Sequence, residues 1–277
     1  MSFMTTSLGV DSILPPEYGA LITDPLEAEA LAFRPQVATT TRLAEHGVLR
    51  IPRVVSDAAA QWVEEGQEIA TSEPTLDEIT VIPTKVAGLV PTSRELANDS
   101  NPGAMDIVGR SLARAIRDQI DAAFTGDLAA PAPSGLASLT DGINVIESGP
   151  LTDLDPIYEA RAAVESAGGS ATVVLVNPAD ALALRKVKES DSSSRGLLDT
   201  LDTLDGVPVI RHAGITAGQL WVIDNSAVYT ALREDVEIAI SDGPYFTSDR
   251  IAIRATARVG IAFPYPGRLA RIDVTAA

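Results

Sequence analysis

The residue types that most often carry out chemistry are scarce in this sequence. The chain has no cysteine and only two histidines, His46 and His212, which are far apart and not linked by any zinc-binding spacing. We therefore expect each histidine to have a surface or structural role. Adjacent acids such as Glu64 and Glu65 could act as a general acid and base, but a chain with 38 acidic residues contains many such pairs by chance.

Three aspartates form a pattern that could hold a cation. Asp199, Asp202 and Asp205 are spaced three residues apart, whereas the ligands of an EF-hand loop alternate. The sequence also contains no P-loop, dinucleotide-binding fingerprint or nucleophile elbow. We predict a protein that is not an enzyme, with no catalytic, cofactor-binding or metal-binding residues. The alternative is a soluble α/β enzyme working through its acids, which would need a convergent pocket of perturbed carboxylates.

The overall composition limits the partners of the chain. With 277 residues, of which 45% are hydrophobic, it can form one large or two modest domains. A net charge of −17 argues against tight nucleic-acid binding, which relies on clustered lysine and arginine. No apolar run reaches the roughly 18 residues of a membrane helix, and no charged-then-apolar leader opens the chain. We expect no membrane partner and assembly in the cytoplasm.

Residues 51–100 predict a long two-stranded arm with almost no core of its own. β-Branched residues at 79–90 favour strand, whereas residues 61–74 are acidic and turn-prone, with Trp62 as the largest apolar side chain. An isolated two-stranded ribbon is only marginally stable in water. The ribbon should therefore lie on another subunit, and Trp62, Glu64 and Glu65 are its candidate contact residues.

One long helix is the clearest element of the sequence. Asn101 and Pro102 mark its start, and Gly126 marks its end. Apolar residues recur between them at three- and four-residue spacing, so one face of the helix should be buried. Arg117 and Asp121 are four residues apart on the charged positions, and we expect them to pair.

Strands and helices alternate after a connection at residues 128–135, which indicates an α/β unit. The last fifty residues are instead rich in strands. A segment rich in Ser and Asp, residues 189–205, is expected to be mobile. The expected elements are helices at 154–167 and 178–188, and strands at 171–176, 207–210, 220–223, 227–233, 236–240 and 250–263.

The final long strand shows a clear alternation. Ile251, Ile253 and every second residue up to Val259 are apolar and predict a buried face, which leaves Arg254 and Arg258 on the other face. Two interpretations of these arginines are open. They pair with acids of a neighbouring strand, such as Glu234 and Glu237, or they form intersubunit salt bridges.

Short motifs in a fixed order connect these elements to a known family. They are Trp62-Val63-Glu64-Glu65-Gly66, Ser72-Glu73-Pro74, Lys85-Val86-Ala87-Gly88, Ser93 to Ser100, Asp121-Ala122-Ala123-Phe124-Thr125-Gly126, Val176-Asn177-Pro178-Ala179-Asp180 and Leu204-Asp205-Gly206-Val207-Pro208-Val209. In order and spacing, over most of the chain, they resemble the major capsid proteins of tailed bacteriophages.

The resemblance implies an α+β fold of the Hong Kong 97 capsid type. The implied parts are an N-terminal arm at residues 1–49, an extended β-ribbon loop at 50–90, a peripheral domain with a β-sheet at 91–140 and 225–265 whose spine helix covers about 102–125, and an axial α/β domain at 141–224 and 266–277.

The resemblance also implies a function and partners. Such a subunit assembles through pentamers and hexamers into an icosahedral virion shell, which encloses double-stranded DNA without specific binding. Scaffolding, portal and decoration proteins are possible further partners. The alternative is an encapsulin, a nanocompartment shell that holds a cargo enzyme. Residues 1–25 are rich in proline, whereas encapsulins usually open with an amphipathic helix, so we favour the phage shell.

Two departures from the family bear on assembly. Some members join subunits by a lysine–asparagine isopeptide bond from the extended loop, but no lysine occurs between Arg53 and Thr84. Cohesion through this loop should therefore be noncovalent. Many members also carry an N-terminal scaffolding segment, and this chain opens on the arm, so we expect either a separate scaffold or a trimmed chain.

Overall fold

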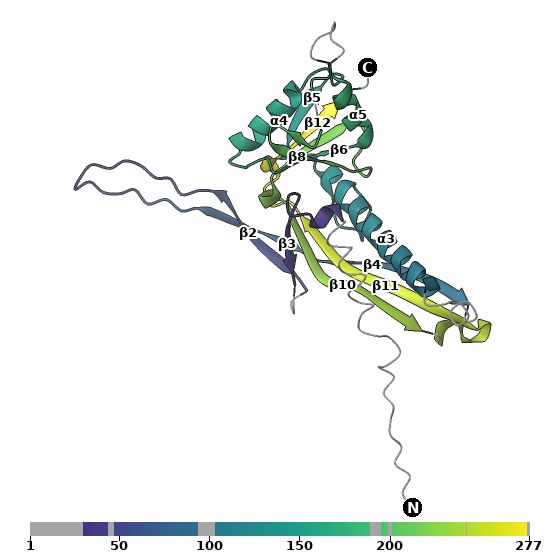
Figure 1. The fold of residues 1–277 in the computed structure, drawn as a ribbon. Helices are drawn as coiled ribbons and strands as arrows, with labels where there is room; N and C mark the ends of the chain where they lie inside the picture. The colour runs from purple at the N-terminus through teal and green to yellow at the C-terminus, as the bar shows by residue number, and fades with distance from the viewer. Residues whose placement is uncertain are drawn as a thin grey trace, which may run out of the picture.

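The computed structural model describes residues 30–43, 47–93, 103–188, 195–198, 201–241 and 243–275. The expected helix start at Asn101-Pro102, His46 and Asp199 lie outside these residues. The described chain forms a four-stranded sheet, a six-stranded sheet and a separate two-stranded ribbon. Figure 1 shows the six-stranded unit above the four-stranded unit, with the ribbon projecting to the left. This α+β architecture agrees with the predicted fold class.

The four-stranded sheet combines segments from distant parts of the sequence. Its order is β1 (Thr39–Arg42), β10 (Tyr229–Ser241), β11 (Arg250–Ala262) and β4 (Thr84–Ser93), with β1 parallel to β10 and the other pairs antiparallel. The long helix α3 (Gly103–Thr125) runs along one face of this sheet (Figure 1). The helix approaches β4 most closely at Gly88, where an added Cβ would lie 2.7 Å from Cδ2 of Leu112.

The main hydrophobic core lies between α3 and this sheet, and it continues under the six-stranded sheet. The expected helical stripe supplies Leu112, Ile116, Ile120 and Phe124, all of them buried. The helix ends at Thr125, so its predicted end near Gly126 is confirmed. The alternation predicted for β11 is confirmed too, since Ile253, Ala255, Ala257 and Val259 are buried.

The six-stranded sheet is mixed and has the order β5 (Asn144–Ser148), β12 (Leu269–Val274), β9 (Gln219–Ile223), β6 (Val173–Val176), β8 (Val207–Arg211) and β7 (Thr203–Leu204). The helices α4 (Asp155–Ser166) and α5 (Pro178–Lys186) bury their apolar residues against one face. Residues on the other face, including Leu175 and Trp221, join the main core. Asp205 and Gly206 both have positive φ and form the tight turn between β7 and β8.

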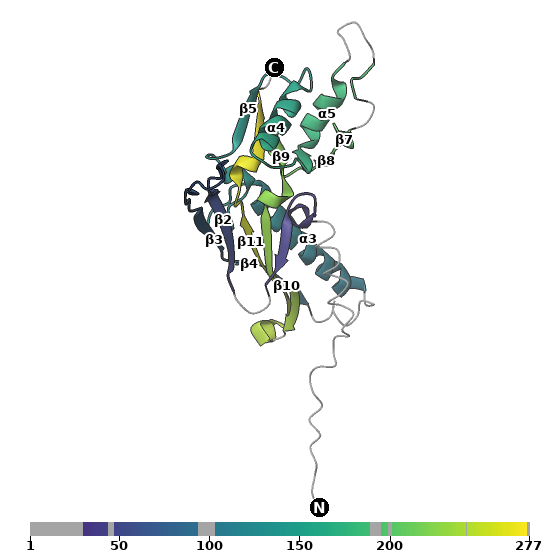
Figure 2. The same ribbon diagram turned by 90° about the vertical axis from the view of Figure 1, so that its left-hand side faces the viewer.

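The ribbon consists of β2 (Leu49–Ser56) and β3 (Thr75–Val81), paired antiparallel. Its base lies against the four-stranded sheet, where Ile51 and Val81 pack with Ala231 and Ala262. Figure 2, turned by 90°, shows β2 and β3 beside the strands of this sheet. Only the base of the ribbon therefore has a core within its own chain.

Two expectations about strands differ from the structure. The strands expected at 227–233 and 236–240 are one strand, β10, whose register against β11 shifts twice between Leu232 and Glu237. The break expected between them is thus an irregularity within a continuous strand. The β-branched run at 79–90 is divided as well, because β4 pairs with β11 and not with the ribbon.

Short 3₁₀ turns connect several of these elements. They are η2 (Leu31–Phe33), η3 (Leu136–Ser138), η4 (Asn225–Ala227), η5 (Gly243–Ser248) and η6 (Pro266–Arg268). The first of them, η2, is buried at all three of its residues.

Candidate assembly surfaces and a buried polar junction

The base of the ribbon is fastened by charged side chains. Arg53 binds Asp77 at 2.6 Å and also donates to the carbonyl of Pro264 at 3.3 Å, which links the ribbon to the end of β11. Arg50 and Glu78 form a second pair at 3.3 Å. Hydrogen bonds from Arg53 and from the backbone N–H of Glu78 lower the pKa of Asp77. Both ion pairs join β2 to β3, and as exposed pairs they add little stability.

Residues 57–74, which we call the ribbon loop, have almost no contacts of their own. The described chain gives the loop two internal hydrogen bonds, from Gln67 N to the carbonyl of Glu64 and from Ser72 Oγ to the carbonyl of Ala59. Trp62 is fully exposed and Ile69 is 73% exposed. The loop has five acidic and no basic residues, namely Asp57, Glu64, Glu65, Glu68 and Glu73. An exposed tryptophan on a loop with so few contacts of its own is typical of a surface that is covered in an assembly.

The face of the four-stranded sheet opposite α3 carries the two arginines noted in the sequence. Arg258 pairs with Glu234 of β10 at 3.2 Å, so for this residue the pairing within the chain is observed. Arg254 lies opposite Ala239 on one side and Leu89 on the other, and the described residues supply no acidic partner for it. Leu89 is more than half exposed. Arg254 and Leu89 thus form an uncovered basic and apolar patch.

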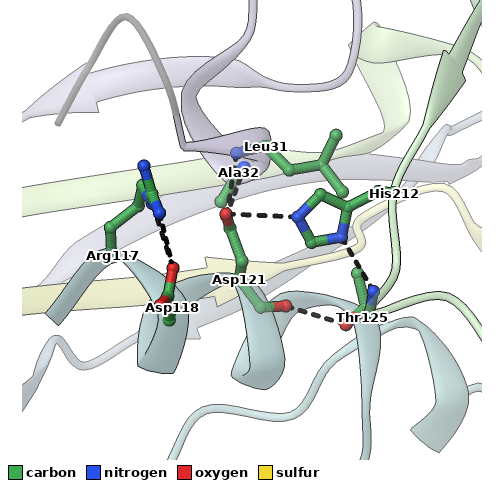
Figure 3. A network of polar contacts seen from close by, with 8 residues as sticks. Leu31, Ala32, Arg117, Asp118, Asp121, Thr125 and His212 are labelled. Atoms are coloured by element: carbon green, nitrogen blue, oxygen red, sulfur yellow. Dashed lines mark hydrogen bonds and ion pairs between the residues drawn. The ribbon is translucent and has the colours of Figure 1, made fainter. Parts of the chain in front are cut away.

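A buried polar junction lies at the C-terminal end of α3 (Figure 3). The carboxylate of Asp121 is 6% exposed and accepts the backbone N–H groups of Leu31 and Ala32, at 2.8 and 3.4 Å. These N–H groups begin the turn η2, which has no capping side chain of its own. Asp121 therefore caps, from 90 residues away, a helical turn whose first donors would otherwise be unpaired.

The second oxygen of Asp121 faces His212, which follows β8 of the six-stranded sheet. His212 Nε2 lies 3.5 Å from Asp121 Oδ2, and His212 Nδ1 accepts the N–H of Gly214 at 3.1 Å. Because Nδ1 accepts, the imidazole proton must be on Nε2, where it points toward the carboxylate (Figure 3). His212 thus lies between α3 and the six-stranded unit.

The pairing expected between Arg117 and Asp121 is wrong. Arg117 binds Asp118 instead, at 2.8 Å, because Asp121 points inward to η2 and His212. Spacing along the helix could not show this, since both partners of Asp121 come from distant segments. The one sequence signal is the position of Asp121 beside the buried stripe residue Ile120.

No group of three or more potential ligand residues gathers to hold a metal ion in the part of the chain that the structure describes. Among these same residues, no helix has the length and apolar character needed to span a membrane. The polar junction uses its carboxylate and imidazole to join segments, and neither is in position to act on a substrate.

Solved structures with the same arrangement come from a GTA particle and from phages. The chain superimposes on the capsid of an empty GTA (gene transfer agent) particle with a TM-score of 0.75 and 18% identity, covering 99% of this chain and 96% of the other. A structure from Microbacterium phage Oxtober96 gives 0.73 and 20% identity, with 98% and 96% covered. A structure from Gordonia phage Cozz gives 0.71 and 18% identity, with 90% and 88% covered. These likenesses define the fold as that of the Hong Kong 97-type capsid subunits.

Sequence comparison defines the family. The model of the phage capsid family matches residues 13–273, and the chain belongs to this family. It is therefore a structural capsid protein and not an enzyme, as predicted. It is 28% identical over 207 residues to the capsid polyprotein of Pseudomonas phage PAJU2, covering 69% of this chain and 31% of that protein. It is 24% identical over 219 residues to the major capsid protein of Staphylococcus phage 80alpha, with 73% and 67% covered.

Proposed function

We propose that this chain is the major capsid subunit of a tailed phage or a gene transfer agent. It assembles with copies of itself into a closed shell around double-stranded DNA. The observation that carries the proposal is the ribbon loop, whose apolar side chains and backbone groups have so few partners in the subunit. Ordering such a loop costs conformational entropy that its own contacts do not offset. A second copy supplies the missing contacts.

The parts of the fold take distinct places in the shell. Residues 1–49 form the arm, 50–90 the extended loop, 91–140 and 225–265 the peripheral domain, and 141–224 and 266–277 the axial domain. In support of this division, α3 and the four-stranded sheet form one layered unit, and the six-stranded sheet with α4 and α5 forms another. The axial domains surround the axes of pentamers and hexamers. A five-fold ring is consistent with the GTA capsid, whose structure was computed with C5 symmetry.

The contacts between copies combine apolar burial with charge. Trp62 is the anchor of the ribbon loop, and Glu64 and Glu65 flank it. Arg254, which is exposed and forms no ion pair within the described chain, receives an acidic group of a neighbouring copy. Arg258 contributes less, because it already binds Glu234. Charge-assisted pairs at the rim of an interface fix its register more than they add affinity.

The net charge fits a container for DNA. At −17, the wall repels the phosphate backbone, so DNA is enclosed without specific binding. A scaffolding protein, a portal and decoration proteins complete the particle. Because the ribbon loop lacks lysine, the shell is held together by noncovalent contacts through this loop.

Expression of the chain alone, followed by sizing chromatography and negative-stain electron microscopy, tests the proposal. We expect uniform empty shells or rings of subunits. Shells that consistently enclose one co-purified enzyme would identify an encapsulin instead. A compact monomer that never assembles, even under conditions that promote assembly, would contradict both.

A further inference from the structure

We infer that Asp121 is a positioning residue that couples the docking of the N-terminal turn η2 to the six-stranded unit. Three segments meet at its carboxylate, and each belongs to a different part of the fold. Asp121 comes from α3, Leu31 and Ala32 come from η2, and His212 follows β8 (Figure 3). Asp224 is equally buried and accepts a backbone N–H from Ser170, 54 residues away, whereas the donors to Asp121 come from 89 and 90 residues away.

The burial of this carboxylate depends on η2. With η2 docked, the side chain of Asp121 is 6% exposed. Leu31 and Ala32 of η2, which bind its carboxylate, are themselves buried. A buried carboxylate must have its charge satisfied by donors, because water no longer hydrates it. Two backbone N–H groups serve Oδ1, and the side chain nearest to Oδ2 is His212, whose Nε2 lies 3.5 Å away, longer than an ordinary hydrogen bond. The docked state therefore needs His212.

The undocked state needs His212 much less. If η2 leaves, water reaches Asp121 and can replace the imidazole proton on Oδ2. Loss of the His212 donor thus raises the free energy of the docked state more than that of the undocked state. This difference is a coupling free energy, and it is reciprocal. Release of η2 must therefore weaken the interaction of His212 with Asp121 by the same free energy.

Other contacts hold η2 and the residues that follow it against the two sheets. Thr230 donates to the carbonyl of Ala32, Asn225 to that of Pro35 and Thr172 to that of Gln36. Thr172 lies next to β6, so the segment that begins at η2 touches both sheets. One consequence rests on the proposed function. A neighbouring copy that binds the N-terminal arm would change the stability of the axial domain through Asp121.

Hydrogen–deuterium exchange on the full chain tests the coupling without requiring a shell. We expect His212→Ala to speed exchange at the amides of Leu31 and Ala32 on the order of tenfold, although residue 212 touches neither amide. His212→Gln keeps an amide donor and should restore most of the protection. The matched control is Arg211→Ala, which breaks the neighbouring pair with Asp202 and should leave these amides unchanged.

The reverse experiment uses Phe33→Ala, which weakens the docking of η2 through a buried side chain. Because the coupling is reciprocal, exchange at the amide of Gly214, which binds His212 Nδ1, should rise more than exchange at other amides of the same core. Equal exchange at residues 31 and 32 in His212→Ala and Arg211→Ala would overturn the inference. Failure of the chain to form shells would count against the proposed function but would leave this comparison intact.

Discussion

Replacement of Trp62 by alanine should separate the stability of the subunit from the stability of the shell. In the subunit the indole is fully exposed at the end of the ribbon loop, so its removal deletes no buried contact. The free energy of unfolding of the monomer should therefore stay within about 0.5 kcal/mol of the parent value. In the shell we propose that the same side chain is buried against a second copy.

The expected loss of binding free energy between copies in the shell is large. A buried tryptophan covers about 150–250 Å², and truncation of a central aromatic anchor typically costs about 2 kcal/mol or more. Each contact between copies would then weaken about 30-fold, and the effect is repeated at every copy. Sizing chromatography over a range of protein concentrations measures the shell yield, and urea denaturation measures subunit stability.

Trp62→Phe is the matched variant, because it keeps an aromatic ring of nearly the same shape. It should assemble far better than Trp62→Ala. Unchanged shell yield in Trp62→Ala would refute the role of Trp62. A fall in subunit stability equal to the fall in assembly would refute the claim that the side chain acts only between copies.

Three further predictions concern the subunit itself. Gly88→Val should destabilise the fold by about 1–3 kcal/mol, because a Cβ there would lie 2.7 Å from Cδ2 of Leu112; equal denaturation midpoints would contradict this. Phe124→Ala, in the main core, should cost about 3–5 kcal/mol in a denaturant titration, and a cost below 1 kcal/mol would mean the site is not packed as described. The pKa of Asp77 is lowered by Arg53, so its charged form favours the folded ribbon; the contribution is present above the ordinary Asp pKa of about 4 and is lost as pH falls through the lower folded value. Amide protection factors along β2 and β3, which compare exchange with the intrinsic rate at each pH, should therefore fall in acid, and Asp77→Asn should remove that pH dependence.

Local sequence signals predicted the regular elements well. The periodic stripe of α3 and the alternation of β11 depend on neighbouring residues only, and both are confirmed. The break expected near residue 235 was wrong, because Glu234 and Asp235 resemble a turn locally while pairing with β11 carries the strand through them.

Contacts between distant segments could not be predicted in the same way. From sequence, Arg258 could pair with Glu234 or Glu237. The register of β10 with β11 places Glu234 opposite Arg258, and these two residues form the ion pair. Asp121 was assigned to Arg117 by helical spacing, whereas its actual partners lie 90 residues before it and beyond β8. The ribbon was predicted to need a neighbour because a two-stranded ribbon has almost no core of its own, and Trp62 in its loop is fully exposed in the subunit.

A cryo-electron microscopy map of the assembled particle would test the central claim most directly. We expect a closed shell in which residues 57–74 of each copy lie on a second copy, with Trp62 buried there and Glu64 or Glu65 within reach of a basic side chain. A shell in which Trp62 stays exposed to solvent and the ribbon loop touches no neighbour would contradict the account.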